Sequence, residues 1–257
     1  MKNNYNFDYV KILLKNDHIP NRMLCFFRKI LPCQNLILFQ NGVYLKKGMY
    51  FKMFIGKWNK SVILTYIGLA ISILGMRICF SNNENSINLA MVCLIIAGIC
   101  DLFDGQIARK CKRTEQEKNF GIELDSLVDT IDFIALPTVL FLKLQMNTWY
   151  YYFVIVIFAI CGIARLAYFN ITIEDNSKPV EYYIGLPVTY TALIFPICYL
   201  LKYILPFNIF LVIYSVLIVF IAILNIIKIK IKKPKGFAYL LFSLLAIIMI
   251  VLYLGVL

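Results

Sequence analysis

The residues of this sequence that are best able to carry out chemistry are four aspartates beside two long apolar segments. Asp101 and Asp104 lie near the end of one apolar segment, and Asp125 and Asp129 lie in the first part of the next. An ionised carboxylate at membrane depth costs at least about 2.5 to 3.5 kcal/mol on insertion scales, so acids in such segments are candidates for function. These four aspartates are the first candidates for a site.

The spacing of the aspartates places them on shared helix faces. At about 100° per residue, two sets of residues each occupy one face of a helix. They are Asp101, Asp104, Gly105 and Ala108 on the first helix, and Gly121, Asp125 and Asp129 on the second. The short charged loop between the two helices makes them antiparallel neighbours, so we expect the four carboxylates to converge near the cytoplasmic membrane surface.

Converging carboxylates repel one another and need cations between them. A set of oxygen ligands favours Mg²⁺ or Mn²⁺, ions that usually complete their shell with phosphate oxygens of a substrate. Gly105 and Ala108 leave room for a ligand to approach the helix backbone, and Arg109 is placed to bind a phosphate. The alternatives are a solvated helix face, an ion pathway in a transporter and, for Arg109 among its basic neighbours, a membrane anchor.

The elements that must position these residues are seven apolar segments. They cover residues 62–80, 87–108, 122–142, 149–169, 184–201, 207–227 and 237–254. Each is about 20 residues long, the length that an α-helix needs to cross about 30 Å of hydrocarbon. The chain is 61% hydrophobic and 16% charged, with a mean hydropathy of +0.77, which is too apolar for a soluble domain. The long apolar runs lack the alternation of a membrane barrel, so we expect an all-α, polytopic transmembrane helical bundle.

The distribution of basic residues predicts the orientation of the bundle. With the N-terminus in the cytoplasm, 23 of the 26 Lys and Arg residues fall on the cytoplasmic side, as the positive-inside rule requires. The three others are Arg77, Lys143 and Lys202. The net charge of +12 therefore indicates topology anchoring and attraction to anionic lipid head groups, and no nucleic-acid partner is expected.

Histidine and cysteine chemistry is not expected at the membrane site. His18 is the single histidine and lies outside every apolar segment, and none of the eight cysteines forms a CxxC pair. This pattern excludes Ser-His-Asp, Cys-His and His-rich zinc sites, and the cysteines are interpreted as small reduced hydrophobic residues.

The expected domain organisation is an N-terminal cytoplasmic or interfacial segment at 1–56 followed by a membrane domain at 57–257. Short apolar pieces in the first segment do not reach spanning length and could form one or two interfacial amphipathic helices. Part of this segment is an upstream extension if translation begins at Met49 or Met53, which closely precede the first apolar segment.

The motif as a whole resembles the signature of the CDP-alcohol phosphotransferase family, also called CDP-alcohol phosphatidyltransferases. In this sequence it reads Asp101-x2-Asp104-Gly105-x2-Ala108-Arg109-x11-Gly121-x3-Asp125-x3-Asp129. The 11-residue gap is longer than is usual in the family, but it falls in the connecting loop, where an insertion is tolerated best. The resemblance implies a six-helix core with its site open to the cytoplasm, and the segment at 237–254 is an addition to that core.

The family resemblance also implies roles for individual residues. Asp101, Asp104 and Asp125 would hold two metal ions, with Asp129 as a further ligand and the general base. The CDP portion would be bound by Asp101, Gly105, Ala108, Arg109 and Gly121. Thr65 could hydrogen-bond the nucleotide, although bonding to its own helix backbone is the alternative.

Further segments resemble the phosphatidylserine synthase branch of the family. Residues 125–137 resemble its acid-rich helix followed by phenylalanine and proline, and residues 185–187 match a Gly-Leu-Pro motif. Residues 165–170 resemble its Arg-Leu-Ala-Arg-Phe-Asn motif, with Tyr168 in place of the second Arg. Arg165 and Asn170 would then bind the acceptor, with Arg165 pairing with the carboxylate of the acceptor. The alternative for Arg165 is snorkelling to the membrane interface. Asp132 lies one turn beyond Asp129 on the same helix face, and no role is assigned to it.

These observations predict an enzyme that transfers a phosphatidyl group from CDP-diacylglycerol to L-serine, releasing CMP, with Mg²⁺ or Mn²⁺ as cofactor. The alternatives are another acceptor (glycerol 3-phosphate or inositol phosphate), a divalent-cation transporter and an inactive membrane scaffold. Membrane lipids are the expected surroundings, and the oligomeric state is left open between a monomer and a homodimer.

Overall fold

The computed structural model describes residues 9–12, 36–39, 42–46, 56, 57, 59–174, 182–232 and 236–255. The chain divides into two compact units, Met1–Trp58 and Asn59–Leu257. In the first unit the described residues form strands β1 (Tyr9–Ile12), β2 (Leu36–Phe39) and β3 (Gly42–Lys46). They pair as an antiparallel sheet in the order β1-β3-β2. The expectation of interfacial helices is therefore wrong for these residues, and Met49 and Met53 lie outside the described ranges.

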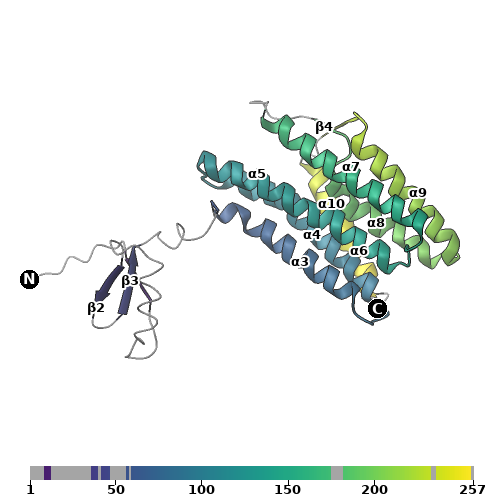
Figure 1. The fold of residues 1–257 in the computed structure, drawn as a ribbon, viewed down its shortest axis with the longest axis horizontal. Helices are drawn as coiled ribbons and strands as arrows, with labels where there is room; N and C mark the ends of the chain where they lie inside the picture. The colour runs from purple at the N-terminus through teal and green to yellow at the C-terminus, as the bar shows by residue number, and fades with distance from the viewer. Residues whose placement is uncertain are drawn as a thin grey trace, which may run out of the picture. The chain divides into compact units, whose positions relative to one another are not determined.

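The second unit is a bundle of α-helices (Figure 1). Its elements are α3 (Ile63–Cys79), α4 (Ser86–Lys110), α5 (Glu115–Thr130), α6 (Leu136–Lys143), α7 (Trp149–Glu174), α8 (Thr191–Tyr199), α9 (Phe207–Ile226) and α10 (Phe237–Gly255). Helix α3 packs on α4, α7 packs on α9, and α10 packs on α4. Among the described residues, five helices are long and apolar enough to cross a membrane. They are 60–79, 86–110, 149–172, 207–226 and 237–255. The chain is thus an all-α polytopic membrane protein.

The third predicted span is helical but is composed of three parts. Helix α5 begins after Thr114, which forms a reciprocal capping box with Glu117, so the helix starts earlier than the apolar segment does. A π-helical turn at Ile131–Ala135 joins α5 to α6. Pro137 has no N–H to donate to the carbonyl of Phe133, and the Thr191 hydroxyl lies 3.5 Å from that carbonyl oxygen.

The fifth predicted span begins later than expected, because a strand precedes it. Strand β4 (Tyr182–Ile184) pairs in antiparallel fashion with β5 (Lys230–Lys232). Gly185 follows with a φ of +74°, and a Cβ there would lie 2.6 Å from the Asn225 carbonyl oxygen. Only glycine fits this left-handed position in such close contact. The helical segment then runs from Val188 to Tyr203.

An aromatic cluster forms the interior of the bundle. Phe141 of α6 contacts Phe195 of α8 edge-on, with ring centroids 5.0 Å apart. The buried Tyr253 hydroxyl near the end of α10 donates to the Pro196 carbonyl at 2.5 Å. Because the Tyr253 side chain is 1% exposed, this bond ties α10 firmly to α8, and α10 is an integral part of the bundle.

Candidate active site

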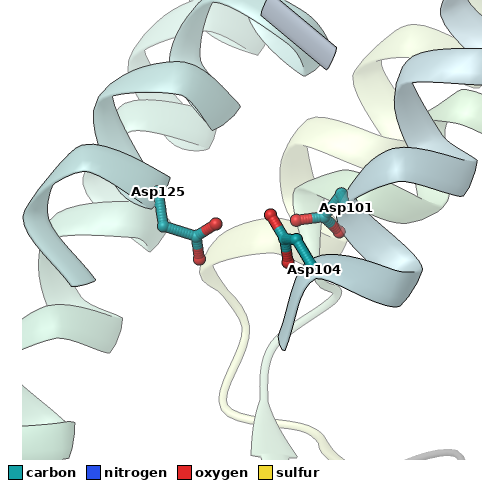
Figure 2. Close-up of side chains that lie close together, drawn as sticks. All are labelled: Asp101, Asp104 and Asp125. Atoms are coloured by element: carbon teal, nitrogen blue, oxygen red, sulfur yellow. The ribbon is translucent and has the colours of Figure 1, made fainter. Parts of the chain in front are cut away.

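Three of the four predicted aspartates come together between α4 and α5. Asp101 and Asp104 project from α4, and Asp125 projects from α5 toward them (Figure 2). One carboxylate oxygen of each residue lies within 4.8 Å of the other two. The spacing of one turn on α4 puts its two acids on the same face, as expected. Asp129, one turn beyond Asp125 on α5, lines the same cavity.

The carboxylate of Asp104 is held by a threonine from a third helix. Thr65 Oγ1 of α3 donates a hydrogen bond of 2.9 Å to Asp104 Oδ2. The two side chains are 8% and 6% exposed, so water does not compete strongly for this bond. Two contacts were considered for Thr65, one with the nucleotide and one with its own helix backbone. The structure shows a third, to a candidate metal ligand on another helix, and the nucleotide contact stays a prediction.

The acids open into a polar cavity of about 220 Å³. Arg165 of α7 lines it, 6% exposed, with its guanidinium 4.8 Å from the centroid of the Phe169 ring. Among the residues that the structure describes, none forms a hydrogen bond with the Nε atom of Arg165. A buried guanidinium with an unused donor is a strong site for an anionic group, so the cavity joins a carboxylate cluster to a fixed cation.

The residues in this cavity fit a divalent metal. Ligand oxygens on one Mg²⁺ lie about 3 to 4 Å apart, since metal–oxygen distances are about 2.1 Å. The oxygens of Asp101, Asp104 and Asp125 lie within 4.8 Å of one another, so small side-chain rotations would bring them to that separation. Three hard oxygen donors are the ligands that Mg²⁺ and Mn²⁺ prefer.

The residues predicted to bind CDP divide into two groups. Gly105 and Arg109 line the cavity together with Asp101. Ala108 and Gly121 are not among its lining residues; a Cβ on Gly121 would instead approach Arg113 and Val62, at 3.7 and 3.9 Å. A role of Ala108 and Gly121 in nucleotide binding therefore stays a prediction.

Asn170 makes a contact that the sequence did not predict. Its Oδ1 accepts a hydrogen bond of 2.7 Å from the Ser126 hydroxyl, and Asn170 is not among the residues that line the cavity. Ser126 follows Asp125 directly on α5. The bond thus links the helix that carries two of the aspartates to the helix that carries Arg165.

Asp132 is buried next to α3. It is 2% exposed, and its Oδ2 would lie 3.1 Å from a Cβ placed on Gly68 of α3. It is not among the residues lining the cavity. The prediction that Asp132 shares the helix face of Asp125 and Asp129 stays a prediction; a π-helical turn begins beside it at Ile131.

Other residues that line the cavity were given no site role from the sequence. They are Leu102, Gln106, Phe169, Tyr183, Pro187, Thr189, Tyr190 and Tyr239, of which Phe169 and Pro187 belong to the motifs at 165–170 and 185–187. Tyr183 comes from β4, and burial, with smaller contributions from Tyr239 and Asp101, raises the pKa of Tyr183 to about 12. The Tyr183 phenol is therefore a neutral hydrogen-bond donor at physiological pH.

An apolar cavity adjoins the polar one. It has a volume of about 220 Å³ and lies between α4, the α8 segment and α10. Leu102, Thr189 and Tyr190 border both cavities. A ligand with a charged end and a hydrocarbon end therefore has matching surfaces next to one another.

A family model and several known proteins are similar to this chain. The family model for CDP-alcohol phosphatidyltransferase matches residues 58–256. A CDP-diacylglycerol–serine O-phosphatidyltransferase of Saccharomyces cerevisiae is 32% identical over 115 residues, which cover 42% of this chain and 41% of the relative. A protein of the same name from Helicobacter pylori is 32% identical over 136 residues, covering 50% of this chain and 53% of the relative.

An archaeal relative carries a related name. The archaetidylserine synthase of Methanothermobacter thermautotrophicus is 30% identical over 110 residues, covering 42% of this chain and 45% of the relative. The matched regions of these relatives thus span about half of their length or less. The family match, in contrast, extends over most of this chain and includes every aspartate of the site. The chain belongs to the CDP-alcohol phosphatidyltransferase family.

Proposed function

We propose that this protein transfers the phosphatidyl group of CDP-diacylglycerol to the hydroxyl of L-serine, giving phosphatidylserine and CMP. The observation that carries the proposal is the convergence of the Asp101, Asp104 and Asp125 oxygens in a cavity shared with Asp129 and Arg165. The names of the relatives support serine as the acceptor.

The cofactor of the proposed reaction is a pair of Mg²⁺ or Mn²⁺ ions. Asp101, Asp104 and Asp125 would hold them, with Asp129 as a further ligand. When bound, such ions neutralise the charge of a pyrophosphate and stabilise the departing phosphate. Thr65 keeps the carboxylate of Asp104 oriented through its 2.9 Å bond, as partners of metal ligands commonly do.

Asp129 acts as the general base in this proposal. The serine hydroxyl attacks the phosphorus that carries the diacylglycerol, and its proton passes to the Asp129 carboxylate. The new bond joins the serine oxygen to that phosphorus, while the bond from the same phosphorus to the bridging oxygen of the pyrophosphate breaks. CMP leaves with the bridging oxygen, so no covalent enzyme intermediate is required.

The two ends of CDP-diacylglycerol fit the two adjoining cavities. Arg109 and Gly105 line the polar cavity and would bind the CDP portion, with Ala108 and Gly121 beside them. The apolar cavity between α4 and α10 would take part of an acyl chain. Burial of hydrocarbon there contributes about 0.8 kcal/mol per CH₂ group.

The acceptor site is formed around Arg165. A serine carboxylate would pair with its guanidinium, whose Nε has no hydrogen-bond partner within the described part of the chain. Asn170 holds the neighbouring helix through Ser126. Glycerol 3-phosphate or inositol phosphate would bring more negative charge than this single α7 arginine neutralises well, so serine is the better fit.

The active site is proposed to face the cytoplasm. With the N-terminus in the cytoplasm, 23 of the 26 Lys and Arg residues fall on that side of the predicted membrane segments, and the four aspartates lie in the cytoplasmic halves of the segments at 87–108 and 122–142. Short positively charged loops remain in the cytoplasm during insertion. A water-soluble acceptor and CMP could then enter and leave without crossing the bilayer.

The test is CMP release from CDP-diacylglycerol in detergent micelles with Mn²⁺ or Mg²⁺. Serine, glycerol 3-phosphate, inositol phosphate and no acceptor are compared, with Asp125→Asn as the inactive control. We expect release that depends on serine and is abolished by a chelator. CMP release driven by another alcohol would overturn serine as the acceptor. If no CMP is released, but the protein carries divalent metal ions across the membrane of sealed vesicles, a transporter would be favoured.

A further inference from the structure

Three tyrosines from separate parts of the chain line the polar cavity beside Arg165. Tyr183 belongs to β4, Tyr190 lies just before α8, and Tyr239 lies in the first turns of α10. All three side chains are half-buried. Arg165 and Tyr190 are also close enough to Tyr183 to influence its ionisation electrostatically. Three phenol-bearing side chains therefore contribute to the wall of the cavity that holds the buried arginine.

Each tyrosine is held in place by its own element. Pairing of β4 with β5 fixes the backbone of Tyr183, whose ring lies 5.9 Å from that of Phe169. The Tyr190 ring packs on Phe242 of α10 at 5.7 Å. The position of Tyr239 depends on α10, which is tied to α8 at its far end by the Tyr253 bond. The arrangement is thus preorganised, which lowers the entropy lost on binding.

The charge of this wall favours a ligand group with a single negative charge. Arg165 supplies one positive charge, and its guanidinium is fixed against Phe169. A carboxylate has two oxygens with about four acceptor sites, more than one fixed guanidinium satisfies. Phenol hydroxyls donate hydrogen bonds without adding charge. A phosphate, with up to two negative charges, would be left less well neutralised.

We propose that the hydroxyls of Tyr190 and Tyr239, together with Tyr183, donate hydrogen bonds to the carboxylate of the acceptor that Arg165 binds. Helix α10 is then part of the acceptor site, although the sequence suggested only an addition to a six-helix core. This inference rests on the proposed function and extends it, because it assigns the residues that select a carboxylate-bearing amino alcohol.

The test uses Tyr239→Phe and Tyr190→Phe in the full-length protein. Each change removes one oxygen and keeps the ring, so packing is preserved. The KM for serine, the KM for CDP-diacylglycerol and the inhibition constant of serinamide are measured; serinamide keeps the amino and hydroxyl groups of serine but lacks the negative charge. Tyr182→Phe is the matched control, because Tyr182 is the exposed neighbour of Tyr183 on β4.

We expect Tyr239→Phe and Tyr190→Phe each to raise the KM for serine about tenfold, because each variant loses one hydrogen bond to a charged group. The KM for CDP-diacylglycerol, the inhibition constant of serinamide and all constants of Tyr182→Phe should remain within about twofold of the unmodified protein. If the two tyrosines only supported the structure, the KM for CDP-diacylglycerol and the KM for serine would instead change together.

Two results would overturn the inference while leaving the proposed function in place. One is an unchanged KM for serine in both cavity variants of an enzyme that is active with serine. The other is a serinamide inhibition constant that rises by the same factor as the KM for serine, since the hydroxyls would then not contact the carboxylate. An unmodified protein without serine-dependent CMP release would remove the proposed function, and the inference with it.

Discussion

Replacing Thr65 with valine should weaken the binding of the divalent metal without changing the fold. Valine has nearly the shape of threonine, so the buried contact between α3 and α4 is kept. What is lost is the 2.9 Å hydrogen bond to Asp104 Oδ2. The carboxylate of Asp104, 6% exposed, cannot replace that bond fully with water.

The magnitude follows from the nature of the bond. A hydrogen bond to a charged group contributes about 1.5 to 3 kcal/mol, which corresponds to about 10- to 100-fold in an equilibrium constant. Loss of a partner that orients a metal ligand typically weakens metal affinity by about the same factor. We therefore expect the Mn²⁺ concentration for half-maximal activity of Thr65→Val to rise about 10- to 100-fold, with kcat at saturating Mn²⁺ within a few-fold of the unmodified protein.

The assay is a Mn²⁺ titration of CMP release at saturating substrates, with Mn²⁺ binding measured separately by electron paramagnetic resonance. Thr172→Val serves as the control, because the Thr172 hydroxyl donates to the Tyr168 carbonyl of its own helix. A Thr65→Val protein with the same Mn²⁺ dependence and affinity as the unmodified chain would refute the assignment of Thr65 as the residue that orients a metal ligand.

Three further predictions address the base, the helix packing and the link between α5 and α7. Asp129→Asn should bind CDP normally by calorimetry while kcat falls at least about 100-fold, and an active variant would rule out Asp129 as the base. Gly98→Ala should lower the melting temperature in detergent, because its Cβ would lie only 2.6 Å from that of Ala192, an overpacking that costs about 1 to 3 kcal/mol; an unchanged melting temperature would contradict this contact. Ser126→Ala should lower kcat/KM about tenfold by removing the 2.7 Å bond to Asn170, and Asn170→Leu should add little in the double variant; fully additive losses would show that the two residues act separately.

The aspartates of the site could be predicted from the sequence because their arrangement is local. Helical periodicity alone places Asp101 and Asp104 on one face, and a short connection makes the next helix an antiparallel neighbour. The structure agrees with the expected convergence, since Asp125 faces the two α4 acids (Figure 2). Within the described residues, five of the seven predicted membrane segments correspond to helices long and apolar enough to cross a membrane; they could be predicted because length and apolarity are properties of consecutive residues.

Other features depend on contacts between distant segments and could not be predicted. Tyr183, Tyr190 and Tyr239 reach one cavity only because a strand pair, a turn and the last helix meet there. The π-helical turn at Ile131–Ala135 was not predicted, because a regular helix was assumed through this segment. The early start of α5, in contrast, has a local signal in the Thr114 capping box, which the hydropathy pattern did not take into account.

The central claim is that the acceptor hydroxyl itself attacks the phosphorus that carries the diacylglycerol. The most direct measurement is mass spectrometry of the lipid and the CMP formed from CDP-diacylglycerol and serine labelled with ¹⁸O in its hydroxyl group. The proposed reaction predicts that the label is retained in phosphatidylserine, between phosphorus and the serine carbon, and is absent from CMP. An unlabelled phosphatidylserine, labelled CMP, or no serine-containing lipid at all would contradict it.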